Sequence, residues 1–340
     1  MKVLFYTGYF KNPWSPINQT GIGGSEVAII KVAESLVKFG WEVIVSGNVE
    51  SGKWNGVEWI PTDRIHKERF NDFDVIVGVS YIHFLIEFEK YSAKKLFWVH
   101  NTDYHPWYKG KEIQDSINLL NPDRLDGIIC LTNWHKEQWS QKYSIDPSRI
   151  HIIGNGIDPQ SFIGHAPKIK NRFIWSSAPE RGLYELLNNW PKIKSIKPDA
   201  ELHVYSPGYQ IATSEKWGRE GLKGVTFKGS VGQVELHSAM LEAEYWMYLT
   251  NYEETYCITA LEMQNAGVFP IVTEVAALKE TVNSGIKVKN AETKWDLSIK
   301  VLDEMSASLK NRVIKENKQH AKMSTWSSRS YEWKQLFDKI

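Results

Sequence analysis

The sequence predicts an α/β protein built from two doubly wound parallel sheets that face each other across a cleft. Short β-branched or aromatic runs alternate with helical patterns, an order typical of a mostly parallel sheet with helices on both faces. The alternation stops at residues 155–171 and then restarts. The length of 340 residues allows two domains with separate cores.

The first half begins with a predicted strand at residues 2–8 and a predicted helix at 23–40. Apolar residues of this helix recur with helical spacing, and Gly40 closes it as a C-terminal cap commonly does. We place the first domain at residues 1–156. Its further strands are predicted at 42–47, 74–80, 95–100, 127–132 and 150–154.

Residues 155–171 hold two Pro, two Gly and few periodic apolar residues, which is typical of a connection. We therefore predict a linker at 157–171, a second domain at 172–320 and a terminal amphipathic helix within 321–340. Ligands of such sheets lie outside the carboxyl ends of the strands, so the loops that follow strands are the candidate site. Strands of the second domain are predicted at 172–177, 201–206, 225–229, 244–250 and 268–273.

Charge and cysteine content narrow the function classes. With 41 basic and 40 acidic residues the net charge is +1, which argues against nucleic acid or an anionic membrane as the main partner. Cys130 and Cys257 are the only cysteines, so we do not expect a disulfide framework. We expect instead a reducing compartment, the cytoplasm. The N-terminal apolar run is too short for a signal peptide, and no run reaches a membrane-spanning length.

A glycine-rich loop precedes the first helix. Gly21, Gly23 and Gly24 remove side chains where the backbone would approach a ligand, and the free N–H groups of the helix start suit a phosphate. The spacing matches neither the dinucleotide fingerprint nor the Walker loop. An ordinary surface loop is the alternative interpretation.

Two glutamates flank a second helix start, which we predict near Tyr256, with the helix running to Ala266 and stopping at Gly267. Glu254 lies just before this helix, where capping is the alternative explanation. Glu262 lies in the second turn of the predicted helix, among apolar residues, where an unpaired carboxylate is costly. Sugars and riboses offer vicinal hydroxyls to such a carboxylate. The pair therefore suits a polyol ligand whose phosphates lie at the helix start.

These motifs resemble the signature of the retaining GT-B glycosyltransferases of family four. The resemblance extends over nearly the whole chain, and the order and spacing of the motifs are more specific than any one of them. The segments that carry the resemblance include "GIGGSE" (21–26), "LFWVH" (96–100), "APERGLYELLNNWPKI" (178–193), "VTFKGSV" (225–231) and "EETYCITALEMQNAG" (253–267). The resemblance implies the GT-B fold, in which the terminal helix packs back on the first domain.

The resemblance also implies roles in binding a nucleotide-diphosphate-sugar donor. Glu262 would bind the ribose hydroxyls, and Glu254 would bind hydroxyls of the transferred sugar. Backbone N–H groups of Tyr256 and Cys257 would lie near the sugar or the diphosphate. Arg181 stands where the family has a diphosphate-binding lysine, and a guanidinium can bind phosphate with two parallel hydrogen bonds.

In the first domain, Gly23 and Gly24 would close on the diphosphate, and His100 would stand beside the donor sugar. One position departs from the family. The second basic residue that the family usually has near the end of the preceding strand falls here at Ser176 or Ser177.

The implied reaction is transfer with retention at the anomeric carbon, catalysed by Glu254, His100 and Arg181. It needs neither metal nor cofactor, because Arg181 and helix N-termini would carry the leaving-group charge. The sequence "DFD" (72–74) resembles the Asp-x-Asp metal motif of another glycosyltransferase class. Here it leads into a strand, and we interpret it as a solvated strand start.

The expected partners are a UDP-, GDP- or ADP-sugar and a carbohydrate acceptor. Tyr104, His105 and Trp107 could stack on the acceptor, although a core or loop-anchoring role is the alternative. The resemblance leaves peripheral membrane contact open. The competing functions are a catalytically silent carbohydrate- or nucleotide-sugar-binding protein on the same fold and a nucleotide-sugar epimerase. A dinucleotide-dependent oxidoreductase fits least, because neither half carries its glycine fingerprint.

Overall fold

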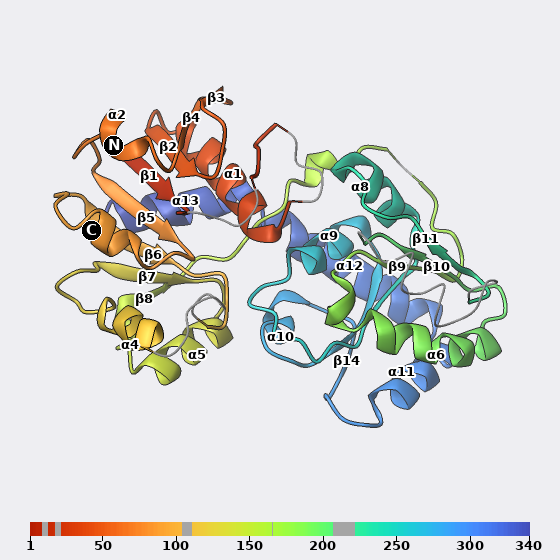
Figure 1. Ribbon diagram of the computed structural model, residues 1–340. Helices are drawn as coiled ribbons and strands as arrows, with labels where there is room; N and C mark the ends of the chain where they lie inside the picture. The colour runs from red at the N-terminus through yellow and green to blue at the C-terminus, as the bar shows by residue number, and fades with distance from the viewer. Residues whose placement is uncertain (9–12, 18–21, 104–110, 165, 207–221) are drawn as a thin grey trace. The chain divides into compact units, whose positions relative to one another are not determined.

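The computed structural model describes residues 1–8, 13–17, 22–103, 111–164, 166–206 and 222–340 (Figure 1). The chain forms two compact units. Unit 1 comprises Met1–Gly156 together with Trp326–Ile340, and unit 2 comprises Ile157–Thr325. The segment predicted as a linker, 157–171, therefore lies in unit 2.

Unit 1 contains an eight-stranded sheet in the order β3-β4-β2-β1-β5-β6-β7-β8. All neighbouring strands are parallel except β3 and β4. The strands are β1 (Lys2–Tyr6), β2 (Glu42–Gly47), β3 (Gly52–Trp54), β4 (Val57–Pro61), β5 (Val75–Val79), β6 (Lys94–Trp98), β7 (Gly127–Cys130) and β8 (Ile150–Ile152). The helices are α1 (Gly24–Val37), α2 (Ile65–Glu68), α3 (Phe84–Glu87), α4 (Lys111–Asn118), α5 (Asn133–Tyr143), η1 (Pro147–Arg149) and α13 (Trp326–Phe337).

The hairpin of β3 and β4 was not predicted, although its turn carries a sequence signal. Asn55 and Gly56 connect the two strands with φ angles of 50° and 83°, and Asn-Gly with two positive φ angles is the favoured two-residue hairpin turn. The six strands that were predicted in unit 1 are all present.

Unit 2 contains a six-stranded parallel sheet in the order β11-β10-β9-β12-β13-β14. The strands are β9 (Arg172–Trp175), β10 (Glu201–Val204), β11 (Val225–Phe227), β12 (Tyr245–Tyr248), β13 (Phe269–Thr273) and β14 (Ile286–Val288). Helical elements are η2 (Pro159–Ser161), η3 (Pro179–Arg181), α6 (Leu183–Ile196), α8 (Gln233–Glu242), α9 (Ile258–Ala266), α10 (Leu278–Thr281), α11 (Lys294–Asp303) and α12 (Ala307–Met323). The short β14 is the one strand of this sheet that the pattern did not predict.

Each sheet has its own apolar core, as two domains require. Central strands such as β5 and β12 are buried along their whole length, which fits sheets covered on both faces. The chain returns to unit 1 through α13, where Trp333 is fully buried. Its ring packs edge-on against Phe5 at 5.7 Å and Trp98 at 4.9 Å, measured between ring centroids. Within the described residues, no helix is both long and apolar enough to cross a membrane.

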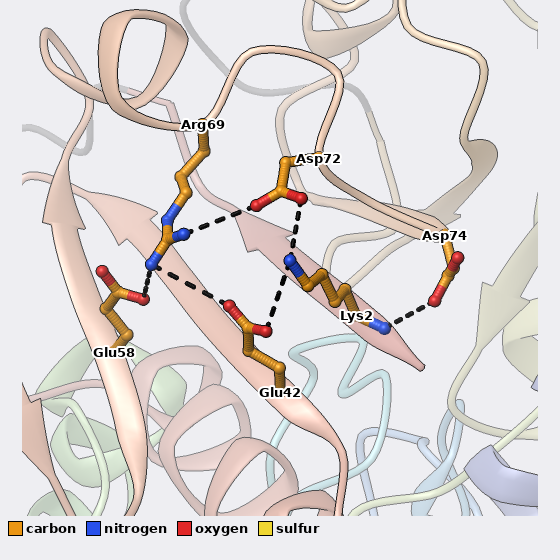
Figure 2. Close-up of polar contacts among 6 residues, drawn as sticks. All are labelled: Lys2, Glu42, Glu58, Arg69, Asp72 and Asp74. Atoms are coloured by element: carbon orange, nitrogen blue, oxygen red, sulfur yellow. Dashed lines mark hydrogen bonds and ion pairs between the residues drawn. The ribbon is translucent and has the colours of Figure 1, made fainter.

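The amino ends of the unit 1 strands carry a network of partly exposed charges. Figure 2 shows its six members: Lys2, Glu42, Glu58, Arg69, Asp72 and Asp74. The Lys2 ammonium donates to Asp72 at 2.8 Å, and the Lys2 backbone N–H donates to Asp74 at 2.7 Å. The "DFD" segment therefore lies at a strand start with its acids paired to Lys2. In the part of the chain that the structure describes, no group of three or more His, Cys, Asp or Glu could hold a metal ion.

Candidate functional site

An ion pair between a buried glutamate and a partly exposed arginine follows the carboxyl ends of β9 and β12 in unit 2. Arg181 ends η3, and Glu254 lies in the loop between β12 and α9. Glu254 is 4% exposed. One nitrogen of Arg181, Nη1, donates to Glu254 Oε1 at 2.6 Å and to Oε2 at 2.8 Å, and the Tyr248 hydroxyl donates to Oε1 at 2.6 Å. The three bonds compensate a carboxylate that would otherwise be costly to bury.

The protonation states of this cluster follow from its surroundings. Burial by itself lowers the pKa of Arg181, but the charge of Glu254 and the nearby Tyr248 and Tyr252 outweigh it and leave that pKa raised. Burial, with Cys257 and Glu254 nearby, raises the pKa of Tyr248 well above its ordinary value. Arg181 therefore stays charged, and Tyr248 keeps the proton that it donates. The Arg181 guanidinium also lies over the Tyr252 ring, 4.4 Å from its centroid.

The helix after Glu254 begins later than predicted. Cys257 has a φ of 70° and caps α9, so the first helical residue is Ile258 rather than Tyr256. A left-handed residue cannot continue an α-helix, which is why the predicted start was wrong. The predicted end at Ala266 and the stop at Gly267 are confirmed. Glu254 therefore lies off the helix, and its backbone carbonyl accepts from the Ala277 N–H at 3.0 Å.

Glu262 lies in the second turn of α9, and its contacts differ from those of Glu254. Its side chain is 15% exposed. Among the described residues, its one hydrogen-bond partner is His237 of α8, whose Nε2 lies 3.5 Å from Glu262 Oε1. That distance is at the limit of a hydrogen bond. Glu262 is therefore mostly buried while keeping most of its capacity to accept hydrogen bonds.

In unit 1, His100 follows the carboxyl end of β6 and is buried. Burial, with a smaller effect of His135, lowers the His100 pKa to about 3. Burial also lowers the pKa of His135 to about 4. Both rings are therefore neutral near pH 7. The carbonyl of the next residue, Asn101, accepts from His135 Nε2 and from Trp139 Nε1, each at 2.9 Å, so α5 anchors the backbone beside His100.

Of the remaining predicted site residues, the structure describes some and leaves others outside its described ranges. Gly23 is the N-cap of α1, and Gly24 is its first residue. A Cβ atom at Gly23 would lie 2.6 Å from a carboxylate oxygen of Glu26, which is the movable end of a flexible side chain. The acceptor candidates, Tyr104, His105 and Trp107, and the loop glycine Gly21 lie outside the described residues.

Three features around the unit 2 site were not predicted from the sequence. His237 stands beside Glu262, and no motif marks it. The Lys294 ammonium is buried, donates to Asn251 and lies 3.2 Å from Glu185, so it anchors the start of the loop that carries Glu254. Ser176, which with Ser177 is one of the two positions where the resemblance expects a second cation, has a buried hydroxyl without a hydrogen-bond partner in the described part of the chain.

Two family models match this chain. Glycosyltransferase Family 4 matches residues 52–161, and Glycosyl transferases group 1 matches residues 170–304. A GDP-mannose:cellobiosyl-diphosphopolyprenol alpha-mannosyltransferase of Xanthomonas oryzae pv. oryzae is 26% identical over 140 residues. That stretch covers 38% of this chain and 36% of the relative, so the chain matches about a third of the relative's length.

Solved structures match the whole fold. HepE from Anabaena in complex with UDP-glucose superposes with a TM-score of 0.76 at 11% identity, covering 100% of both chains. WaaG, a glycosyltransferase involved in lipopolysaccharide biosynthesis, gives a TM-score of 0.71 at 14% identity, covering 99% of both chains. At these identities the likeness is one of fold. The two family matches together run from β3 to α11 in the order expected of such a protein, and the chain belongs to the GT-B glycosyltransferases of family four, group 1.

Proposed function

We propose that this protein is a retaining glycosyltransferase. It moves a sugar from a nucleotide-diphosphate-sugar to a hydroxyl of a carbohydrate acceptor without a metal ion. The observation that carries the proposal is Glu262, a mostly buried carboxylate with one long contact among the described residues. A ligand that brings paired hydroxyls would supply the missing donors. A nucleotide ribose has that chemistry, and the relatives named above act on GDP-mannose or bind UDP-glucose.

Arg181 supports the diphosphate part of the proposal. Both of its bonds to Glu254 come from Nη1. Its Nε and Nη2 have no hydrogen-bond acceptor among the described residues, so their N–H groups are available to phosphate oxygens. The guanidinium is charged at every accessible pH, as its raised pKa requires. It can therefore stabilise the charge that develops on a leaving diphosphate.

Glu254 fits the sugar end of the donor. A carboxylate offers about four lone-pair sites, and Glu254 uses three of them on Arg181 and Tyr248. One site is then left for a hydroxyl of the transferred sugar. His100, which is neutral, would be the unit 1 group beside that sugar, and the donor phosphate itself can take the acceptor's proton.

The test is calorimetric titration with UDP, GDP and ADP and their common sugar conjugates, with and without EDTA. Glu262→Gln should weaken binding by about 1.5–3 kcal/mol, roughly 10- to 150-fold in Kd, because hydrogen bonds to a charged group are lost. Glu253→Gln, at the exposed neighbour of Glu254, is the matched control and should bind like the wild type. If the Glu262→Gln and wild-type proteins bound the nucleotide with equal affinity, the assignment of Glu262 to the ribose hydroxyls would be wrong.

A catalytically silent nucleotide-sugar-binding protein is the second candidate, and Ser176 is the observation that favours it. Ser176 or Ser177 stands where the resemblance expects a second cation, so neither residue supplies that positive charge to the diphosphate. Binding of a nucleotide sugar without turnover, tested with a panel of sugar acceptors and by release of the free nucleotide, would favour this candidate. Turnover with retention, read from the anomeric proton of the product, would exclude it.

A further inference from the structure

We propose that His237 is a positioning residue that holds the Glu262 carboxylate in the orientation needed for ribose binding. The inference rests on the proposed function, because it assigns Glu262 to nucleotide hydroxyls. His237 lies on α8 and is buried. Its Nε2 faces Glu262 Oε1 at 3.5 Å, and its Nδ1 lies 3.1 Å from the Ser161 hydroxyl oxygen. The imidazole therefore connects the candidate ribose-binding carboxylate to η2.

The direction of the hydrogen bonds follows from Ser161. Its hydroxyl donates its one proton to the Asp158 carbonyl at 2.7 Å. The Ser161 oxygen is therefore an acceptor toward His237, and the Ser161 carbonyl, 3.4 Å from Nδ1, is another. His237 Nδ1 must carry a proton to donate to them. With Nδ1 as a donor, Nε2 also carries a hydrogen only in the doubly protonated imidazolium ring, which then donates to Glu262 in a charge-assisted hydrogen bond.

Packing fixes the ring in this orientation. The Phe162 side chain stacks on the imidazole with ring centroids 4.0 Å apart and an interplanar angle of 13°. Ser161 and Phe162 follow the boundary between the units at Gly156 and Ile157 by a few residues. Ser161 and Phe162, at the start of unit 2, thus fix the orientation of the His237 ring, and the ring in turn fixes the position of one carboxylate oxygen of Glu262. The other oxygen and the remaining lone pairs stay available to two ribose hydroxyls.

The experiment compares variants with the nucleotide that the wild type binds and with its 2′,3′-dideoxy counterpart. His237→Phe keeps an aromatic ring beside Phe162 but removes both donors, and should raise the Kd for the ribonucleotide about tenfold, as loss of one bond to a charged group implies. The Kd for the dideoxynucleotide should not change, because that ligand brings no hydroxyls to Glu262.

A hydrogen-bond donor at the position of His237 Nε2 should be enough to keep ribonucleotide binding. His237→Gln places an amide N–H near the Nε2 position, and its Kd should stay within about threefold of the wild-type value. Ser161→Ala keeps the imidazole but removes one acceptor, so its effect should have the same sign and be smaller. It also provides the test if His237→Phe does not fold. In a Glu262→Gln background the effect of His237→Phe should vanish. His203→Phe, on β10 of the same unit, is the control and should leave both affinities unchanged.

The outcomes separate the two proposals. If the wild type prefers the ribonucleotide to the dideoxynucleotide but His237→Phe binds both as the wild type does, the role of His237 is excluded while the proposed function stands. Equal weakening of both ligands by His237→Phe would mean a general structural effect and would also exclude it. A wild-type protein that binds no nucleotide, or binds both forms equally, would remove both proposals.

Discussion

After the carboxyl ends of β6 and β7 in unit 1, His100 and His135 are buried as neutral rings, whereas after the carboxyl end of β12 in unit 2 Glu254 is buried and paired with the Arg181 cation. The two units share one architecture, and both hold titratable side chains away from water. Unit 1 does so by keeping them uncharged, and unit 2 by pairing opposite charges. The fold therefore fixes where these groups lie, and local partners decide which charge each carries.

The largest effect is expected from breaking the charged pair. Arg181→Ala leaves Glu254 buried without its cation, which costs 3–5 kcal/mol when both partners are fully buried. The Arg181 side chain is still 34% exposed. We therefore expect a loss of about 3 kcal/mol in the free energy of unfolding, at the low end of that range, measured by denaturant unfolding.

The control is Arg64→Ala, which removes a guanidinium from an exposed pair with Glu68. It should cost no more than about 1 kcal/mol. Adding Glu254→Gln to Arg181→Ala should restore part of the lost stability, because the unpaired charge is then gone. An Arg181→Ala protein as stable as the Arg64→Ala protein would mean that the pair is solvated and that the contrast between the units is wrong.

The neutral histidines of unit 1 predict acid sensitivity. Their folded pKa values, about 3 and about 4, lie below the ordinary value of 6.5. As the pH falls below 6.5, the unfolded chain binds protons that the folded chain excludes, so stability is lost down to the folded pKa values. At pH 5 each histidine should cost about 2 kcal/mol relative to neutral pH.

Unfolding measured from pH 7 to pH 5 checks this expectation. His100→Asn should reduce the slope of stability against pH over this range. A slope that His100→Asn does not alter would show that the ring is protonated in the folded protein and would break the comparison.

Backbone strain beside the charged pair should give a smaller effect. Cys257 is a non-glycine residue with a φ of 70°, which costs about 1–2 kcal/mol in an L residue. Cys257→Gly should therefore be more stable than Cys257→Ala by about 1 kcal/mol, the reverse of the usual order. The reference is Ala260→Gly inside α9, which should lower stability by about 1 kcal/mol. If the usual order holds at both positions, Cys257 is not strained.

The smallest effect is expected in the exposed network of Figure 2. Asp72→Asn weakens one contact of Lys2, which keeps its contact with Glu42. Hydrogen bonding from Lys2 lowers the pKa of Asp72, yet both side chains are well exposed and their attraction is screened by water and salt. The thermal midpoint should not change measurably. A loss as large as that of Arg181→Ala would mean that these six charges act as one cooperative unit.

Particular elements show which parts of the fold could be predicted from the sequence and which could not. Alternating apolar runs predicted nearly all the parallel strands, because a strand buried on both faces must be apolar along its length. The hairpin of β3 and β4 was missed, although the Asn55-Gly56 pair is a turn signal that the sequence carries. The start of α9 was misplaced because the helical pattern continues through Cys257, while the backbone there does not.

The sequence by itself determined the two-sheet architecture, the family, and Glu254 and Glu262 as candidate site residues, since these depend on local periodicity and on motifs read along the chain. The tertiary structure alone decided which groups meet. It paired Arg181 with Glu254, placed His237 beside Glu262, and buried His100 and His135 together. These residues are far apart in the sequence, and their charges depend on burial and on partners in space, which no local pattern encodes.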